Sequence, residues 1–298
     1  MIKRTLYFGN PAYLKTCNEQ LVFESPETGE TKQVPIEDIG VLITDHQQIT
    51  ISQALIAKLL ANNVAFIVCD HTHHPTGLLL NLDGNSLQSA KFNAQVEATI
   101  PLKKQLWQQT VSIKITNQAT LLEKQLVPVK NMQNWATEVK SGDGDHHEAM
   151  AAAYYWKNIF PDFLEFRRER YGPPPNNLLN YGYAILRAIV ARSLVASGLL
   201  PTLGIFHKNQ YNAYCLADDI MEPYRPFVDK IVVDIVRMNG KFLELTPNMK
   251  KELLNLPAVD VKMKGEKSPL MVAVQKTTAS LSKCFEGKLR KIDYPEFL

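Results

Sequence analysis

The 298-residue sequence predicts an α+β fold, with a small β-rich N-terminal domain that contains one helix and a larger all-α C-terminal domain. Two observations support this division. Short strand-like runs separated by turns occupy the first part of the chain, whereas apolar residues recur with helical spacing in the rest. The turn Asp83-Gly84-Asn85-Ser86 lies where the pattern changes. We therefore expect one domain over residues 1–84 and a second over residues 85–298.

The N-terminal domain is expected to place its strands around one short helix. Residues 52–62 have the apolar spacing of an amphipathic helix, and Ser52 is a suitable N-cap. Turn sequences such as Asn10-Pro11 and Glu27-Thr28-Gly29 separate the strand-like runs. The expected strands are residues 4–8, 20–24, 32–36, 40–44, 65–69 and 77–82.

The C-terminal domain is expected to be organised around a helix over residues 177–197. Ala, Ile, Leu and Val occupy most of its positions, and a helix that is apolar on nearly every side is normally buried in a large domain. Ser197-Gly198 ends this helix, and Pro201 prevents its continuation. The other expected helices are residues 86–98, 101–126, 131–140, 145–158, 161–171, 215–222, 224–239, 247–256 and 269–286.

Composition and cysteine content are typical of a globular protein in a reducing compartment. Hydrophobic residues make up 45% and charged residues 21% of the sequence. No stretch is expected to reach the ~20 apolar residues that a membrane span needs. The N-terminus lacks the apolar core of a signal peptide, so we expect a cytoplasmic location. The four cysteines are far apart and form no C-x-x-C pair, which argues against a disulfide framework or a zinc ribbon.

Basic residues gather in two places, although the net charge is only +3. One cluster is Arg167-Arg168-Glu169-Arg170. The other lies between Lys262 and Lys291, where basic residues far outnumber acidic ones. Each cluster is either a solvated face or a surface that contacts phosphates, and both interpretations stay open at this point.

Glu148 has two equally good interpretations. It follows Asp145 by three residues, so the pair fits a capping box at the start of a helix. A carboxylate at this place could equally serve catalysis. The cluster Cys69-Asp70-His71-Thr72-His73-His74 is better explained as a polar turn after a strand, because no second group of ligands with zinc spacing accompanies it.

The segment from His207 to Glu222 combines one imidazole with three carboxylates. Asp218 or Asp219 can share a helical face with Glu222. Imidazole together with carboxylates suits Mg²⁺ or Mn²⁺ better than zinc. The alternative is that acids in the first turn of a helix are favoured by its dipole without any metal.

Several other chemistries lack their motifs. The sequence contains neither a G-x-x-x-x-G-K-[ST] loop nor a G-x-G-x-x-G turn after a strand, which removes the common routes to nucleotide binding. It also contains no G-x-S-x-G nucleophile elbow. Divalent-metal chemistry on an anionic substrate is therefore the interpretation that the candidate residues favour.

Six short segments combine a helix start, the centre of the apolar helix and the acidic segment. They are Glu148-Ala-x-Ala-Ala, Asn176-Asn177, Leu179-Asn-Tyr-Gly-Tyr183, Gly198-Leu-x-Pro201, Leu203-Gly-x-x-His207 and Leu216-Ala-Asp-Asp-x-Met-Glu-Pro-x-Arg-Pro226. With these segments the sequence resembles, across essentially its whole length, the integrase subunit of CRISPR adaptation, a metal-dependent DNA endonuclease, and within that family the branch of the single-effector (type II) systems.

The resemblance implies the metal ligands. In that family one Glu, one His and one further acid bind the catalytic Mg²⁺ or Mn²⁺, and these positions fall on Glu148, His207 and Glu222. Many relatives have Asp as the third ligand, and Asp219 is the possible auxiliary residue here.

The resemblance also implies partners and a reaction. The protein would form a homodimer through its N-terminal domain, and two dimers would flank a small ferredoxin-like second adaptation subunit in a heterohexamer-type integrase on double-stranded DNA. A 3′-hydroxyl of a short DNA fragment would attack a phosphodiester at the repeat border of the CRISPR array. The alternatives are a structure-specific metal-dependent nuclease acting on branched DNA and a non-catalytic DNA-binding scaffold. The candidate contacts to the DNA backbone are Arg167, Arg168, Arg170, Arg187, Arg192, Lys208 and Arg225. For Arg187 and Arg192, structural pairing within the helical domain is an equally good interpretation.

Overall fold

The computed structural model describes residues 3–163, 166–240 and 242–298, and it divides into two compact units. Unit 1 comprises Met1–Ser86 and unit 2 comprises Leu87–Leu298. The division lies two residues after the boundary expected from the turn at residues 83–86.

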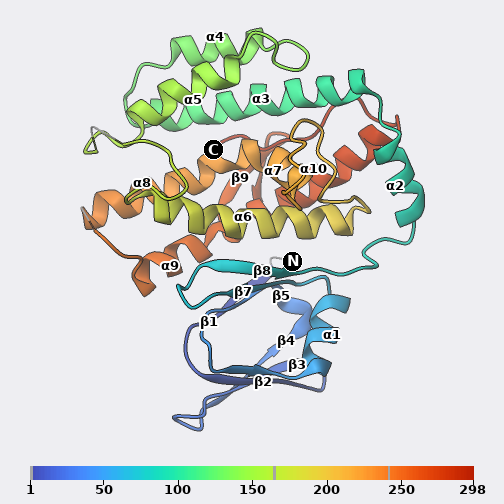
Figure 1. Cartoon of the computed structure of the whole chain (residues 1–298), viewed down its shortest axis with the longest axis vertical. Helices are drawn as coiled ribbons and strands as arrows, with labels where there is room; N and C mark the ends of the chain where they lie inside the picture. The colour runs from blue at the N-terminus through green and yellow to red at the C-terminus, as the bar shows by residue number, and fades with distance from the viewer. Residues whose placement is uncertain (1–2, 164–165, 241) are drawn as a thin grey trace. The chain divides into compact units, whose positions relative to one another are not determined.

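In its described residues, unit 1 contains two four-stranded sheets, the α-helix α1 and a short 3-10 turn, η1 (Ile36–Asp38) (Figure 1). The first sheet has the order β1-β5-β7-β8 and the second has the order β4-β3-β2-β6. The elements are β1 (Arg4–Phe8), β2 (Ala12–Cys17), β3 (Gln20–Glu24), β4 (Thr31–Pro35), β5 (Ile39–Thr44), β6 (Ile49–Ile51), α1 (Gln53–Ala61), β7 (Ala65–Cys69) and β8 (Pro75–Leu79). Side chains from both sheets and from α1 form one apolar core, as Leu14, Leu42 and Leu59 illustrate.

Two strands of unit 1 were not expected, namely β2 and β6. The hairpin that joins β2 to β3 turns at Asn18 and Glu19, which both have positive φ. Such turns usually carry an Asn-Gly or Asp-Gly signal, which is absent here. Strand β6 has only three residues and pairs in parallel with β2, so it has little sequence pattern of its own.

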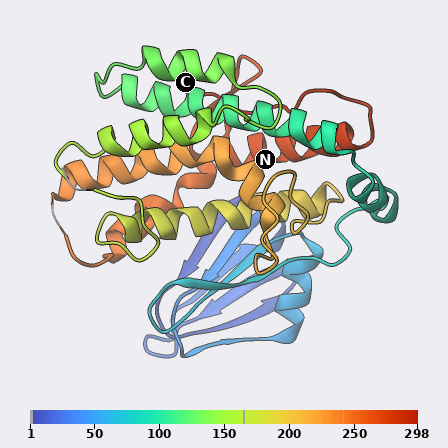
Figure 2. The ribbon, with the colours of Figure 1, turned by 45° about the horizontal axis from the view of Figure 1, so that its top comes forward.

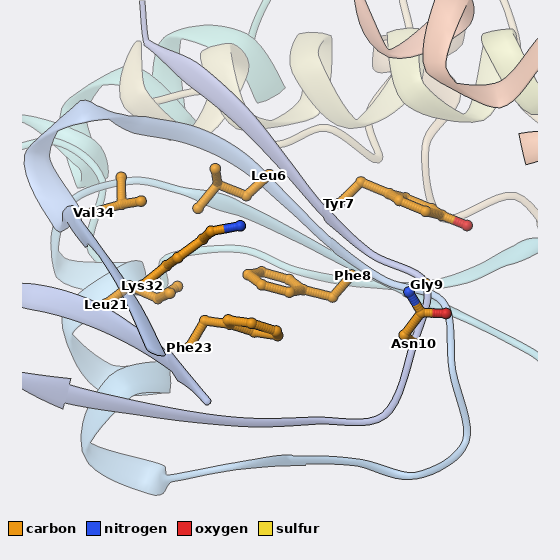
Figure 3. A pocket seen from close by; sticks show the side chains of 9 residues that line it. All are labelled: Leu6, Tyr7, Phe8, Gly9, Asn10, Leu21, Phe23, Lys32 and Val34. Carbon is orange, nitrogen blue, oxygen red and sulfur yellow. The ribbon is translucent and has the colours of Figure 1, made fainter. Parts of the chain in front are cut away.

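An apolar pocket opens in unit 1 beside strand β1 (Figure 3). Its volume is about 280 Å³. Its walls include Leu6 and Phe8 of β1, Phe23 of β3 and Val34 of β4, and the rings of Phe8 and Phe23 stack at 5.7 Å. The pocket is distant in sequence from the residues that carry the predicted chemistry.

Unit 2 is mostly helical. Its helices are α2 (Gln88–Val96), α3 (Ile100–Glu123), α4 (Lys130–Glu138), α5 (His147–Asn158), α6 (Asn176–Ala196), α7 (Cys215–Met221), α8 (Arg225–Asn239), α9 (Pro247–Leu254) and α10 (Leu270–Phe285), with short 3-10 turns η2 (Glu222–Tyr224) and η3 (Leu256–Ala258). Helices α4 and α5 lie along one side of the long helix α3, and α8, α10 and α6 lie on its other side (Figures 1 and 2).

Helix α6 is the buried centre of unit 2, as its composition predicts. It packs against α7, α8, α9 and α10. By length and hydropathy alone α6 is apolar enough to cross a membrane, so the expectation that no stretch reaches this limit was wrong. However, 78% of its most apolar window is buried inside the protein, which is the pattern of a core helix.

Two parts of unit 2 differ from the predicted all-α arrangement. Strands β9 (Asp260–Met263) and β10 (Glu266–Pro269) form a hairpin that turns at Lys264-Gly265, where both residues have positive φ. The alternation of exposed and buried residues in β9 is the strand signal that the basic residues of this segment concealed.

The helix expected over residues 161–171 is also wrong for the residues that are described. Residues 161–163 and 166–171 form turns and irregular chain, and Leu164 and Glu165 lie outside the described residues. The Asn176 side chain satisfies this backbone instead, since its oxygen accepts from the N–H of Glu169 at 3.0 Å and its amide donates to the carbonyl of Arg167 at 2.9 Å.

Candidate metal centre

Glu148 lies in the first turn of α5, but it does not take part in capping this helix. The carboxylate of Asp143 caps α5 by accepting from the backbone N–H groups of His147 and Glu148, both at 3.0 Å. Asp145, the expected N-cap, instead forms an ion pair with Lys140 at 2.7 Å. The capping-box interpretation of Glu148 was therefore wrong, and its side chain is available for another role.

The carboxylates of Glu148 and Glu222 meet at the ammonium group of Lys114. Lys114 Nζ lies 2.7 Å from Glu148 Oε1 and 2.6 Å from Glu222 Oε2. The three residues come from α3, α5 and η2, which are far apart in the sequence. Asn117, one turn after Lys114 on α3, donates to the carbonyl of Pro223 at 2.8 Å and so ties η2 to α3.

Glu222 remains ionised because it has two cationic neighbours. Arg225 Nε donates to Glu222 Oε1 at 2.8 Å, while Lys114 holds the other oxygen. Burial by itself raises the pKa of Glu222, but Arg225 and Lys114 outweigh it and lower that pKa to about 2. Burial likewise acts to lower the pKa of Lys114, and the two glutamates reverse this and raise it.

His207 is oriented by Asp219 and by an aromatic pair. His207 Nδ1 donates to Asp219 Oδ1 at 2.5 Å, which leaves Nε2 as the nitrogen available to a ligand. This hydrogen bond is the main reason why the pKa of His207 is raised. The rings of His207 and Trp107 form a T-shaped pair with their centroids 5.7 Å apart. Trp107 in turn stacks on Phe206, with a centroid distance of 4.2 Å.

The structure brings the three predicted ligands into one electrostatic environment. The charges of Glu222 and Glu148 both contribute to the raised pKa of His207. Within the described residues, however, no three His, Cys, Asp or Glu side chains already surround a common point as metal ligands do. The ammonium of Lys114 lies between the two carboxylates instead. A stand-in cation, two carboxylates and an imidazole fit a divalent ion in charge and in donor type.

The neighbouring acids have structural roles. Asp219 is fully buried and accepts hydrogen bonds from the backbone N–H groups of Ile205 at 2.7 Å and Phe206 at 2.9 Å, in addition to its contact with His207. Asp218 pairs with Arg187 at 2.7 Å, so the structural interpretation of Arg187 applies.

The candidate DNA-contact residues fall into two groups. Arg167, Arg170 and Lys208 are exposed. In contrast, Arg225 is held by Glu222, and Arg168 donates to the side-chain oxygens of Asn176 and Asn180. Arg192 is almost fully buried in α6, where burial lowers its pKa to about 10. Of the second basic cluster, the following residues form ion pairs: Lys262 with Glu296, Lys264 with Asp293, Lys267 with Asp260 and Lys288 with Glu286.

A small basic pocket lies beside His207. Its volume is about 250 Å³, and it is lined by Lys103, Lys104 and Lys208 together with the aromatic rings of Trp107 and Phe206. Trp107 is buried and Phe206 is 45% exposed, so the pocket combines lysines with one accessible ring, as surfaces that bind single-stranded nucleic acids do.

Lys114, Trp107 and Asp143 were missed by the interpretation of the sequence. A signal for Lys114 was present, since it is the one charged residue in the β-branched run Thr110–Thr116 of a helix that packs against its neighbours. A lone charge among apolar residues is worth attention because burial without a partner is costly. Trp107 has no comparable signal, because its role depends on the distant loop that carries Phe206 and His207. The cap at Asp143 is local, but Asp145 has the more familiar capping spacing with Glu148 and drew the prediction instead.

Residues 6–243 match the family model described as CRISPR associated protein Cas1. The chain belongs to the Cas1 family. It is also 33% identical to the CRISPR-associated endonuclease Cas1 of Neisseria meningitidis serogroup C over 301 aligned positions, which cover 100% of this chain and 97% of the relative. The CRISPR-associated endonuclease Cas1 2 of Saccharolobus solfataricus is 30% identical and covers 76% of this chain and 73% of the relative. The family expected from the motifs is thereby confirmed, and the relatives' names agree with the expected class of enzyme.

Solved structures show the same Cas1 fold. A casposase bound to integration product superimposes with a TM-score of 0.80 at 19% identity, over 97% of this chain and 92% of the other. A Cas1 protein from Thermotoga maritima gives a TM-score of 0.78 at 16% identity, over 96% of this chain and 98% of the other. The expected fold class, a strand-rich N-terminal part followed by a mostly helical C-terminal part, is confirmed.

Proposed function

We propose that this Cas1-family protein is a metal-dependent DNA endonuclease and integrase that inserts short DNA fragments into a CRISPR array. The observation that carries the proposal is the position of the Lys114 ammonium, held between Glu148 and Glu222 in the place that suits a metal ion. The relative from N. meningitidis is named an endonuclease, and the casposase structure contains an integration product. Both relationships agree with a reaction on phosphodiesters.

In the proposed site Glu148, Glu222 and His207 hold one Mg²⁺ or Mn²⁺ ion. When bound, the ion would stabilise the charge that develops on the phosphorus and on the leaving oxygen as a 3′-hydroxyl attacks the phosphodiester. Arg225 keeps one oxygen of Glu222 in place, and Asp219 keeps His207 in the tautomer that exposes Nε2. Asp219 is therefore a positioning residue in this proposal.

The DNA is proposed to pass over the basic pocket beside His207. Lys103, Lys104 and Lys208 line this pocket, and Arg167 and Arg170 are exposed elsewhere on unit 2. Contacts of this kind bind the phosphate backbone without regard to sequence, and they weaken steeply as salt rises.

The assembly is proposed to follow the resemblance. The protein would act in the prokaryotic cytoplasm as a homodimer joined through unit 1, with two dimers on a small ferredoxin-like subunit. In support, a structure named as a Cas6-RT-Cas1–Cas2 complex contains a chain with the fold of this protein, at a TM-score of 0.76 and 18% identity over 99% of this chain and 36% of the other.

The decisive experiment is an integration assay with the small partner subunit, Mg²⁺ or Mn²⁺, a fragment with free 3′-hydroxyl ends and a supercoiled repeat target. Glu148→Ala and His207→Ala should each abolish joining, with the circular dichroism spectrum and the oligomeric mass unchanged. The control is Glu252→Ala, which removes an exposed carboxylate of α9 and should leave joining intact. Near-parental joining by Glu148→Ala would refute the catalytic assignment. Cleavage of branched DNA without joining would favour a structure-specific nuclease, and equal behaviour of all the variants would favour a DNA-binding scaffold.

A further inference from the structure

We propose that Lys114 is an internal cation that occupies the metal position in the metal-free enzyme and must leave it when the divalent ion binds. The inference rests on the proposed function, because it assumes that Glu148 and Glu222 are metal ligands. It adds a competition between a side chain and the metal at the same carboxylates.

The contacts of Lys114 are those of a bridging cation. Its ammonium lies within 2.7 Å of one oxygen from each glutamate. The side chain of Lys114 is 11% exposed, that of Glu222 is 7% exposed and that of Glu148 is 23% exposed. Two carboxylates gathered at such low exposure repel each other unless a positive charge lies between them. Lys114 is therefore what allows the two glutamates to converge in the absence of metal.

The net charge of the site indicates that the divalent ion and the Lys114 ammonium cannot both remain between Glu148 and Glu222. Glu148, Glu222 and Asp219 carry three negative charges and Lys114 with Arg225 carries two positive ones, so with a neutral His207 the net charge of the group is −1. A divalent ion added to the same oxygens would change the net charge to +1 if Lys114 stayed, whereas departure of the ammonium would leave the largely buried site neutral. Removal of a charge from water at low exposure is costly unless it is matched.

Lys114 is the cation that can leave. Arg225 is packed over the ring of Tyr183 at 4.5 Å and is held by Glu222 Oε1 in addition. Lys114 has one flexible aliphatic stem, so its ammonium can swing away from the carboxylates without a movement of α3. The oxygens that it releases are Oε1 of Glu148 and Oε2 of Glu222, the atoms that face each other across the site.

The first test is the affinity for Mn²⁺ of the metal-free full-length protein without DNA, measured by calorimetric titration. Lys114→Met keeps the length and removes the charge, so the dissociation constant should fall on the order of tenfold, a normal size for coupling between two binding events. Lys114→Arg restores a competing cation and should return the constant towards the parental value. Lys251→Met, which removes an exposed lysine of α9, should leave it unchanged. A constant for Lys114→Met that equals or exceeds the parental one overturns the inference.

The second test uses the parental protein and so does not depend on the folding of a variant. The metal-free protein should protect Lys114 from acetylation by an N-hydroxysuccinimide ester, measured by peptide mass spectrometry. Saturating Mg²⁺ should increase its labelling several-fold, while labelling of the exposed Lys251 of α9 stays constant. Equal protection of Lys114 with and without Mg²⁺ overturns the inference.

The two proposals fail in different ways. If the parental protein binds Mn²⁺ and Glu148→Gln abolishes that binding, the metal centre stands. A Mn²⁺ dissociation constant that is unchanged in Lys114→Met then refutes only the displacement of Lys114 by the metal. If the parental protein binds no Mn²⁺ at Glu148, the metal centre and the displacement are both wrong.

Discussion

At the scale of single residues, Asp219 acts on the candidate metal centre through His207. One of its oxygens accepts from the ring and the backbone N–H of His207, and the other accepts from the N–H groups of Ile205 and Phe206. A carboxylate used in this way is saturated with hydrogen bonds, so it orients a ligand better than it could serve as one.

Asp219→Asn should therefore weaken the metal site while preserving its shape. An amide has one acceptor oxygen instead of two, so it cannot satisfy both the ring of His207 and the backbone of the preceding residues. We expect Mn²⁺ to bind about 10- to 100-fold more weakly, as is typical when the partner of a metal-ligating histidine is lost. The measurement is a calorimetric titration.

The matched control is Asp218→Asn, which changes the adjacent carboxylate. Asp218 pairs with Arg187 and with Asn212 at 2.7 Å, away from His207. This variant should bind Mn²⁺ as the parental protein does. If Asp219→Asn also retained parental affinity, orientation of His207 by Asp219 would have no part in metal binding.

Residue chemistry explains which part of the site could be predicted. Glu148, His207 and Glu222 were accessible because imidazole and carboxylates within recognisable motifs point to a metal. The role of Lys114 was not, because the lone charge in an apolar run does not tell which two distant segments supply its partners. The cap at Asp143 is local, and it was missed because the spacing of Asp145 and Glu148 fits a capping box better.

At the scale of elements, the loop before α7 has no room for a side chain at Gly204. A Cβ added there would lie 2.4 Å from the carbonyl oxygen of His207 and 2.8 Å from Asp219 Oδ2. The first obstacle is backbone, which cannot give way as the end of a side chain can. Gly204→Ala should therefore displace His207 and weaken Mn²⁺ binding by about tenfold or more, measured by the same titration.

Gly182→Ala provides a contrast in the middle of α6. Its Cβ would lie 2.4 Å from Val228 Cγ1 and 3.1 Å from Leu253 Cδ2, so it would overpack the core between α6, α8 and α9. Overpacking of this kind costs about 1–3 kcal/mol of stability. The variant should unfold at a lower temperature but bind Mn²⁺ normally when folded. If Gly204→Ala bound Mn²⁺ with the parental affinity, the close packing around position 204 would not be needed for the metal site.

The long helices were predictable because each has a strong apolar period and a clear end. The helix expected over 161–171 failed because the side chain of Asn176, on a later element, takes over the hydrogen bonds of that backbone. The strands β9 and β10 were missed because each has only four residues, the alternation is confined to β9, and both lie within a basic run. In each case a tertiary contact or a neighbouring charge outweighed local propensity.

At the scale of the whole molecule, a buried polar cluster joins three helices of unit 2. Asp229 of α8 accepts hydrogen bonds from Tyr155 of α5 at 2.7 Å and from Tyr183 of α6 at 2.5 Å. Asp229 is 1% exposed, and burial raises its pKa from 3.8 to about 6 despite the two hydroxyl donors. The stability of unit 2 should therefore depend on pH in a way that this one carboxyl controls.

The sign follows from the raised pKa of Asp229. Between about pH 4 and pH 6 the folded protein binds the proton of this carboxyl more tightly than the unfolded chain does, so stability falls as the pH rises through this window. The contribution reaches at most about 3 kcal/mol, because one pKa unit corresponds to about 1.4 kcal/mol. Asp229→Asn cannot ionise, so its stability relative to the parental protein should increase from about pH 4 to about pH 7.

Urea unfolding followed by tryptophan fluorescence measures this difference in unfolding free energy for unit 2. All three tryptophans, Trp107, Trp135 and Trp156, lie in unit 2, so the signal reports on that unit even if the two units unfold separately. Comparison of the variant with the parental protein at each pH cancels the titration of every other group that the two share. If the stability of the variant relative to the parental protein stayed constant across the window, the pKa of Asp229 would be the same in the folded and unfolded chains. If it fell as the pH rose, the pKa would be lowered in the folded protein. The cluster would then stabilise the contact of α5, α6 and α8 as an ionised acceptor, and this contribution would be lost in acid.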